Sequence, residues 1–178
     1  QPKMLRAQVE RMLTDARAEA LVENFASEWL DLRKVLTMKP DEQYLEYDDE
    51  LGWSLAAETK GFFREVLARD RSVTEFVDSD WTMVNQRLAK HYGIPGVNGL
   101  AIQKVKLPPD SKRGGLLTHA SILKVSANGT STSPVIRGVW VLERILGITP
   151  SPPPPGTPGV EPDIRGAKTV REILDKHR

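Results

Sequence analysis

The sequence predicts an all-α protein: two packed helical units, followed by an irregular, proline-rich C-terminal region. Three observations lead to this prediction. Apolar residues recur at three- and four-residue spacing through most of the first hundred residues, as in helices that bury one face. A second set of helical patterns follows a connector over residues 94–109. The chain then enters four consecutive prolines, Pro152–Pro155, which only an extended backbone accommodates.

The first unit is expected to cover residues 1–98. The spacing of apolar residues predicts one continuous helix over residues 16–34, which Thr14 or Asp15 can cap with a side-chain oxygen. A second, longer helix is expected over residues 50–69, because the two aspartates before it suit a helix N-terminus. We interpret this half of the chain as a helical packing unit.

Shorter elements complete the first half. The run Ser72-Val73-Thr74-Glu75 has the form of a capping box and predicts a short helix. A further helix is expected over residues 82–92, where Gly93 suits the C-terminal cap and Pro95 prevents the helix from resuming. Residues 101–107 alternate weakly, which allows one short strand, but the sequence shows no obvious partner strand for it.

The second unit is expected to cover residues 99–178. A Gly-Gly turn leads into a predicted helix over residues 116–125, after which the chain becomes polar. The helix over residues 134–146 is the best defined, because Ser133 suits the N-cap and a proline occupies the first helical position. A second capping box, Thr169-Val170-Arg171-Glu172, predicts the start of a last helix.

The composition argues against several classes of protein. A net charge of +1 provides no basic surplus for a nucleic-acid surface, and no apolar run approaches the roughly 18 residues of a membrane span. The absence of cysteine rules out disulfides and thiolate metal sites within these 178 residues. We recognise no catalytic set and no metal-ligand spacing, and therefore predict neither catalytic residues nor a metal site. Because the chain begins with Gln1 and not Met, we expect it to be a segment of a longer polypeptide.

Four motifs are specific enough to indicate a family. They are Asn24–Leu30 (NFASEWL), Asn85–Gly93 (NQRLAKHYG), Gly115–Ser121 (GLLTHAS) and Thr132–Glu143 (TSPVIRGVWVLE). With these motifs the chain resembles domains of unknown function in the large exported cytochrome c-linked proteins of planctomycetes and related bacteria. The first half is similar to the end of one such domain and the second half to the next. One departure is Ser131, where many members of the family have arginine before Thr-Ser-Pro.

The resemblance implies a haem outside this chain. In such proteins a Cys-x-x-Cys-His site, the attachment motif of a c-type haem, follows shortly after the region that corresponds to the end of this sequence. We therefore expect no cofactor within these residues and a c-type haem in the neighbouring segment. The resemblance also implies an exported protein, periplasmic or at the cell surface, whose partners include the adjacent domains of the same polypeptide and an unidentified redox partner.

Two functions of different classes remain open. The first, which we favour, is a non-catalytic scaffold that packs beside the c-type haem segment and orients it for electron transfer. The second is a carbohydrate-binding or polysaccharide-degrading module with the haem as a redox accessory, which predicts a cleft lined by exposed tryptophan or tyrosine and by carboxylates. A weaker third hypothesis is an interaction module that uses Pro152–Pro155 to dock a partner.

Histidines are the first candidate site residues. His119 follows the Gly-Gly turn and could be a distal haem ligand, because neutral imidazole binds iron well. The alternative, which we favour, is a histidine hydrogen-bonded within the protein. His91 and His177 are weaker candidates of the same kind.

Arg137 is the second candidate. It falls in the first turn of its predicted helix, where its positive charge opposes the helix dipole. Such a placement usually implies a compensating partner of negative charge. We expect either a salt bridge to a carboxylate of the first half, such as Glu28 or Glu58, or a bound anion, and favour the salt bridge.

Overall fold

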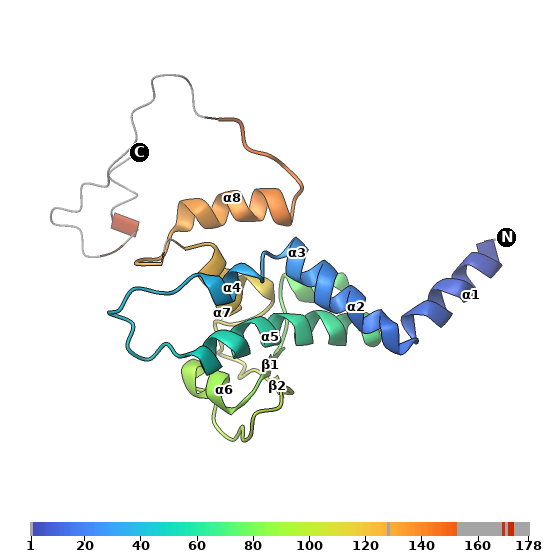
Figure 1. The fold of residues 1–178 in the computed structure, drawn as a ribbon, viewed down its shortest axis with the longest axis horizontal. Helices are drawn as coiled ribbons and strands as arrows, with labels where there is room; N and C mark the ends of the chain where they lie inside the picture. Colours follow the sequence, from blue (N-terminus) through green and yellow to red (C-terminus); the bar gives the residue numbers. More distant parts are fainter. Residues whose placement is uncertain (1, 128, 153–168, 170, 173–178) are drawn as a thin grey trace. The chain divides into compact units, whose positions relative to one another are not determined.

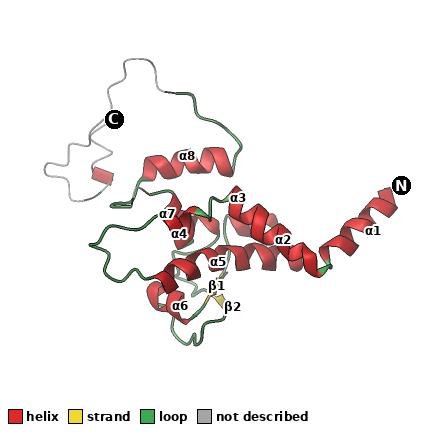
Figure 2. Cartoon of the chain, in the orientation of Figure 1, coloured by secondary structure: helices red, strands yellow, loops and turns green. Residues whose placement is uncertain are grey.

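The computed structural model describes residues 2–127, 129–152, 169 and 171–172. The chain divides into two compact units, Gln1–Arg137 and Gly138–Arg178. Figures 1 and 2 show a chain dominated by helices, with one small sheet. The division into these units differs in position from the boundary expected after residue 98, which concerned the ends of two family domains and stays a prediction. No helix among the described residues is long and apolar enough to cross a membrane.

The prediction of an all-α fold is wrong, because the first unit contains a two-stranded sheet. Strand β1 (Trp81–Val84) pairs antiparallel with β2 (Gln103–Lys106), with Trp81 opposite Lys106 and Val84 opposite Gln103. The protein is therefore mixed α and β. The strand expected over residues 101–107 is present as β2. Its partner, β1, lies mostly within residues 82–92, for which the sequence predicted a helix.

Asn85 explains why the helix predicted over residues 82–92 begins four residues later than expected. Its side-chain Oδ1 accepts a 2.9 Å hydrogen bond from the backbone N–H of Leu88, so α6 (Gln86–Tyr92) begins directly after it. The residues before Asn85 are then free to extend into β1. At the other end, Gly93 has φ of 70° and caps the helix as expected.

The helix expected over residues 16–34 is interrupted. It is divided among η1 (Ala16–Ala18), α2 (Glu19–Leu21), the π-helical η2 (Val22–Ala26) and α3 (Ser27–Trp29). Asp15 caps η1 as expected, accepting a 2.9 Å hydrogen bond from the N–H of Arg17. The helical course then breaks at Asp31, which has φ of 58°, and resumes in α4 (Lys34–Thr37).

Helix α5 (Asp49–Ala68) is the central element of the first unit, and it matches the predicted helix over residues 50–69. Asp48 caps it by accepting a 2.6 Å hydrogen bond from the N–H of Leu51. The helix contacts α4, α6, α7 (Ala120–Val125) and β1, so its buried face forms the floor on which these elements pack. The largest fully buried apolar side chains of the unit are Leu30, Leu32, Val35, Phe62, Val84, Leu88, Leu116 and Ile122.

The remaining described elements are short or terminal. They are α1 (Pro2–Leu13), η3 (Val73–Phe76), η4 (Leu116–Thr118) and α8 (Pro134–Arg144). In the first capping box, Ser72 caps η3 as expected. Glu75 instead accepts hydrogen bonds from the side chains of Arg71 and Trp81. In the second, Thr169 and Glu172 exchange two 3.2 Å hydrogen bonds, which confirms that box. His177 and most of the proline run lie outside the described residues.

Candidate functional site

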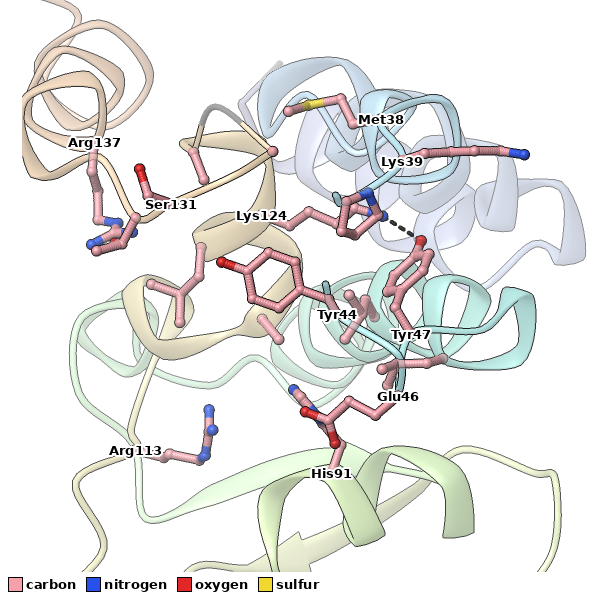
Figure 3. Close-up of a pocket in the computed structure, with 18 residues that line it drawn as sticks. Met38, Lys39, Tyr44, Glu46, Tyr47, His91, Arg113, Lys124, Ser131 and Arg137 are labelled. Carbon is pink, nitrogen blue, oxygen red and sulfur yellow. Dashed lines mark hydrogen bonds between the residues drawn. The ribbon is translucent and has the colours of Figure 1, made fainter. Parts of the chain in front are cut away.

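The first unit contains an open pocket of about 470 Å³. Its walls come from the segment before α5, from α5 itself, from α7 and from the loop that leads into α8 (Figure 3). Apolar carbon forms most of the lining, with polar and charged side chains distributed around it. The lining residues are Met38, Lys39, Pro40, Tyr44, Glu46, Tyr47, Leu51, Leu55, His91, Arg113, Ala120, Leu123, Lys124, Ala127, Gly129, Ser131, Thr132 and Arg137.

Lys124 is a half-buried cation on the wall of this pocket. Its Nζ donates a 2.6 Å hydrogen bond to the carbonyl oxygen of Val35 and a second hydrogen bond to the hydroxyl of Tyr47. Burial disfavours the charged amine and lowers the pKa of Lys124 to about 8. Both of these partners are neutral groups, and within the described part of the chain no carboxylate lies within 4.0 Å of this ammonium.

Among the residues that the structure describes, Arg137 contacts neutral groups and forms no salt bridge. Its Nε donates to Oγ of Ser126 at 3.2 Å, and its Nη2 donates to Oγ1 of Thr132 at 3.0 Å. Neither hydroxyl carries a charge. Among the described residues, no carboxylate lies within 4.0 Å of this guanidinium.

The two carboxylates expected as partners of Arg137 have other contacts. Glu28 pairs with Arg33 at 3.2 Å, in an exposed ion pair. Glu58 is buried and accepts hydrogen bonds from two hydroxyl groups. The sequence left two roles open for Arg137, a salt bridge to one of these carboxylates or the binding of an anion. Because both carboxylates contact other groups, the geometry is compatible with anion binding.

Arg113 connects the pocket with the protein interior, since it lines both the pocket and a small cavity beside His119. Its Nη1 donates a 2.9 Å hydrogen bond to the carbonyl oxygen of Thr118, and its Cζ lies 3.6 Å from the centroid of the Tyr92 ring. This stacked cation also acts on the interior: burial raises the pKa of Glu58, and the positive charge of Arg113 partly opposes that rise.

The remaining polar groups of the pocket come from the segment before α5 and from α6. The hydroxyl of Tyr44 donates a 2.6 Å hydrogen bond to the carbonyl oxygen of Thr130, which ties that segment to the loop before α8. Figure 3 shows Glu46 and His91 next to each other on one side of the pocket. Burial lowers the pKa of His91, and the charge of Glu46 opposes that shift.

A buried polar cluster lies beneath the pocket, centred on Glu58 of α5. Thr82 donates a 2.7 Å hydrogen bond to Oε1 of Glu58, and Tyr92 donates a 2.6 Å hydrogen bond to Oε2. Burial nevertheless dominates and raises the pKa of Glu58 to about 7. The backbone N–H of Ala120 donates to the Tyr92 hydroxyl at 2.9 Å, so this cluster joins α5, β1, α6 and α7.

His119 lies in the same interior and is only 2% exposed. Its Nδ1 is 2.9 Å from Oγ1 of Thr59, which is in turn 2.6 Å from Oγ of Ser121. Its Nε2 is buried without a hydrogen-bond partner, and its ring meets the ring of Phe62 edge-on at a centroid distance of 5.0 Å. Burial lowers the pKa of His119 to about 3, so the ring is neutral at neutral pH.

A distal haem ligand needs a free ring nitrogen and a path to the iron. Nε2 of His119 satisfies the first requirement, since no hydrogen-bond partner occupies it. The enclosed ring does not satisfy the second unless the surrounding elements move. Haem ligation by His119 therefore stays a prediction. The alternative that we favoured, a hydrogen-bonded histidine, agrees with the contact between Nδ1 and Thr59.

The Gly-Gly turn positions both Arg113 and His119. Gly115 has φ of 69°, and a Cβ atom built on it would lie 2.5 Å from the carbonyl oxygen of Val77. Only glycine fits such a close approach in this backbone conformation. The turn thus has a packing role: it lets the chain pass against residues 76–79 before η4 and α7 begin.

The sequence did not indicate Lys124, Tyr47, Tyr44 or Arg113 as site residues. They lie far apart in the chain, and isolated lysines, tyrosines and arginines are usual on protein surfaces. Trp81 lies in the core, stacked on Phe62 at a centroid distance of 4.2 Å. Trp53 differs, with 65% of the residue exposed.

Metal binding finds no support in the described geometry. Within the described ranges, no three His, Asp or Glu side chains come together as a metal site. The acidic run at residues 48–50 instead serves the N-terminus of α5, as the capping of Leu51 by Asp48 shows.

Comparison with known proteins identifies the chain at the level of its domains. A search of curated proteins and a search of solved structures each found no significant match. Two family models match in sequence order. PSD4, described as a protein of unknown function (DUF1592), matches residues 1–94, which is more than half of the chain; PSCyt3, a protein of unknown function (DUF1588), matches residues 113–178. The chain thus belongs to the DUF1592 family and continues into a DUF1588 region, both domains of unknown function of the planctomycete cytochrome c-containing protein type.

Proposed function

We propose that this chain is a non-catalytic scaffold module of an exported, cytochrome c-linked multidomain protein, and that it packs beside a c-type haem carried by a neighbouring segment. The main support is the order of the two family matches, one cytochrome-associated domain type following another along a single chain. In such an arrangement each module has neighbours on the same polypeptide, which are its natural binding partners.

The chemistry of the interior also supports a scaffold over an enzyme. The one buried carboxylate described above, Glu58, accepts hydrogen bonds with both oxygens, and His119 is enclosed beside it. A general acid or base must reach a substrate within hydrogen-bond distance, and these two groups face only protein. Their bonds instead hold α5, β1, α6 and α7 together, which is the task of a rigid support.

The haem of this proposal would be attached elsewhere. A c-type haem is held by two cysteine thioethers, and the 178 residues contain no cysteine. The role proposed for this chain is therefore to hold and orient the haem segment. The proposed exported location follows the same resemblance.

The experiment uses the parent polypeptide, extended past Arg178 and produced in a host that matures c-type haem. A protease site placed after Arg178 separates the two parts covalently after purification. We expect the haem-containing part, followed by its Soret absorption, to co-elute with this chain on size-exclusion chromatography after cleavage. Independent elution of the two parts at micromolar concentration would contradict the scaffold function.

The same polypeptide tests haem ligation. Replacing His119 with Ala is expected to leave the Soret band in place, because the ring is enclosed in the present structure. A shift of the Soret band in this variant, with the Soret band of a Thr59→Val control unchanged, would instead assign His119 as a ligand. The Thr59→Val control removes the hydrogen-bond partner of the ring while leaving the imidazole available.

The carbohydrate-binding alternative has one specific observation in its favour. Tyr44 is 44% exposed at the pocket that also contains the carboxylate of Glu46, and aromatic faces beside carboxylates suit sugar rings. This alternative predicts retardation of the chain in affinity electrophoresis through a polysaccharide gel. The retardation should disappear in Tyr44→Ala and persist in Trp53→Ala, since Trp53 does not line this pocket.

A further inference from the structure

The pocket of the first unit combines an apolar body with an excess of positive charge. Its floor includes the buried side chains of Leu51 and Leu55, with Leu123 on an adjoining wall. A volume of about 470 Å³ is within the range of cavities that bind small organic molecules. An apolar floor of this kind favours a ligand that carries hydrocarbon or an aromatic ring, and disfavours a bare inorganic ion.

The charges of the lining residues do not cancel. Arg113, Lys124 and Arg137 approach from three different elements, whereas Glu46 is the one carboxylate among the lining residues and lies on the His91 side. In the part of the chain that the structure describes, no carboxylate lies within 4.0 Å of any of the three cations. The whole chain has a net charge of only +1, so the pocket concentrates positive charge that the rest of the surface balances.

The cations also retain hydrogen-bond donors. An ammonium has three N–H groups, and two of those on Lys124 are used by Val35 and Tyr47. A guanidinium has five, and Arg137 uses two of them on neutral hydroxyls. The neutral partners hold both side chains in place without neutralising them. Such fixed cations with unused donors are suited to a carboxylate, which accepts several charge-assisted hydrogen bonds.

We propose that this pocket binds a small organic acid, a molecule with an apolar or aromatic body and a carboxylate that Arg137 recognises, while the ammonium of Lys124 adds positive potential from the opposite wall. The body lies against Leu51, Leu55 and Leu123, and the ring of Tyr44 covers it from the solvent side. This site gives the chain a ligand of its own and does not depend on the haem or on the scaffold function proposed above. It fulfils the bound-anion role that the sequence left open for Arg137.

The test is calorimetric titration of the full chain with 2-naphthoate, a planar aromatic carboxylate. The matched control ligand is 2-naphthamide, which has the same body but no charge. We expect the acid to bind at least tenfold more tightly than the amide, and inorganic phosphate at the same concentration to leave naphthoate binding unchanged. Equal affinity of acid and amide would overturn the proposal, as would displacement of naphthoate by phosphate alone. This comparison uses the unaltered protein and so does not depend on the folding of a variant.

Two substitutions then locate the site. Arg137→Gln removes the charge and retains donors for Ser126 and Thr132, and it is expected to weaken naphthoate binding at least tenfold with little change in the melting temperature. Arg33→Gln is the control, because Arg33 is an exposed arginine outside the pocket that pairs with Glu28. Unchanged naphthoate affinity in Arg137→Gln, or an equal loss in Arg33→Gln, would overturn the assignment.

Discussion

The hydroxyl of Tyr92 donates a 2.6 Å hydrogen bond to Oε2 of Glu58, a carboxylate that is almost completely enclosed by protein. The same hydroxyl accepts a 2.9 Å hydrogen bond from the backbone N–H of Ala120. One side chain of α6 therefore links the central helix to the start of α7, and the guanidinium of Arg113 lies against its ring. This link holds the floor of the pocket to the helix that carries Lys124.

The first prediction concerns this link. Tyr92→Phe removes a donor from Glu58 and an acceptor from Ala120, and is expected to lower the free energy of unfolding by about 1–3 kcal/mol. The loss should be larger at pH 8 than at pH 5, because the ionised carboxylate depends more on the lost donor. Urea denaturation at the two pH values measures it. Tyr44→Phe is the matched control, since it removes an exposed hydroxyl bond and should cost about 0.5 kcal/mol or less. Equal losses in both variants would show that the buried hydrogen bonds of Tyr92 stabilise the fold no more than the exposed hydrogen bond of Tyr44 does.

The second prediction is the pH dependence that Glu58 confers. Its pKa is raised from 4.5 to about 7 in the folded protein, so its contribution to stability is fully present below pH 4.5 and is lost as the pH rises through 7. The shift corresponds to about 3 kcal/mol. Glu58→Gln cannot ionise and is expected to remove this loss, so the variant becomes more stable than the unaltered chain at pH 8. A variant that is less stable at pH 8 would mean that the ionised carboxylate is favourable in the fold.

His119 is expected to act in the opposite sense. Burial lowers its pKa from 6.5 to about 3, so its contribution is present above pH 6.5 and is lost as the pH falls toward 3. Between pH 4.5 and 6.5 the effects of Glu58 and His119 oppose each other, and the stability of the unaltered chain should change little. In that interval Glu58→Gln should gain stability with pH by about 1.4 kcal/mol per unit, and His119→Gln should lose it at a similar rate. Parallel curves for the two variants would rule out this balance.

Local signals predicted the ends of several elements correctly. Asp48 and Gly93 satisfy free backbone groups at helix ends, and such caps depend on residues only a few positions apart. The strand Trp81–Val84 was missed because its evidence is not local: its partner, Gln103–Lys106, lies some twenty residues further along the chain. The spacing of apolar residues before Asn85 is compatible with a helix. Residues 81–84 form a strand because they pair with residues 103–106.

The pocket could not be predicted for the same physical reason. Its charged residues are separated by tens of positions, and only the packing of α7 and of the loop after it against α5 brings them around one cavity. Arg137 was the exception, because its charge in the first turn of a helix already indicated an unmet requirement for a negative partner. The sequence favoured a salt bridge because carboxylates are common, and Glu28 and Glu58 are bonded elsewhere.

A fourth prediction tests the Gly-Gly turn. Gly115→Ala places a Cβ atom 2.5 Å from the carbonyl oxygen of Val77 in a left-handed backbone conformation, so both a clash and backbone strain oppose it. We expect a loss of about 3 kcal/mol or more in the free energy of unfolding. Gly93→Ala is the milder comparison, because Gly93 has the ordinary left-handed conformation (φ 70°, ψ 27°), whereas Gly115 has φ 69° and ψ 179°, and a Cβ atom on Gly93 meets nothing within 4 Å. That variant should lose only about 1 kcal/mol. Similar losses at both positions would mean that the clash at Gly115 is relieved by small movements.

The last prediction joins the proposed ligand to the titration of Lys124. The pKa of this amine is lowered to about 8, so its charge, and with it part of the attraction for a carboxylate, disappears as the pH rises above 8. The affinity for 2-naphthoate is therefore expected to decline progressively as the pH rises from about 7 to about 9, most steeply near pH 8.

Other groups around the pocket respond differently over that range. Burial raises the pKa of Tyr47, so its hydroxyl stays neutral to higher pH than usual. His91 is already neutral in this range because burial lowers its pKa. Lys124→Met should therefore bind naphthoate more weakly at pH 7 and lose the fall above pH 8. A fall that persists in Lys124→Met would assign the titration to another group. Binding that is independent of pH in the unaltered chain would show that the carboxylate is recognised by Arg137 without the help of Lys124.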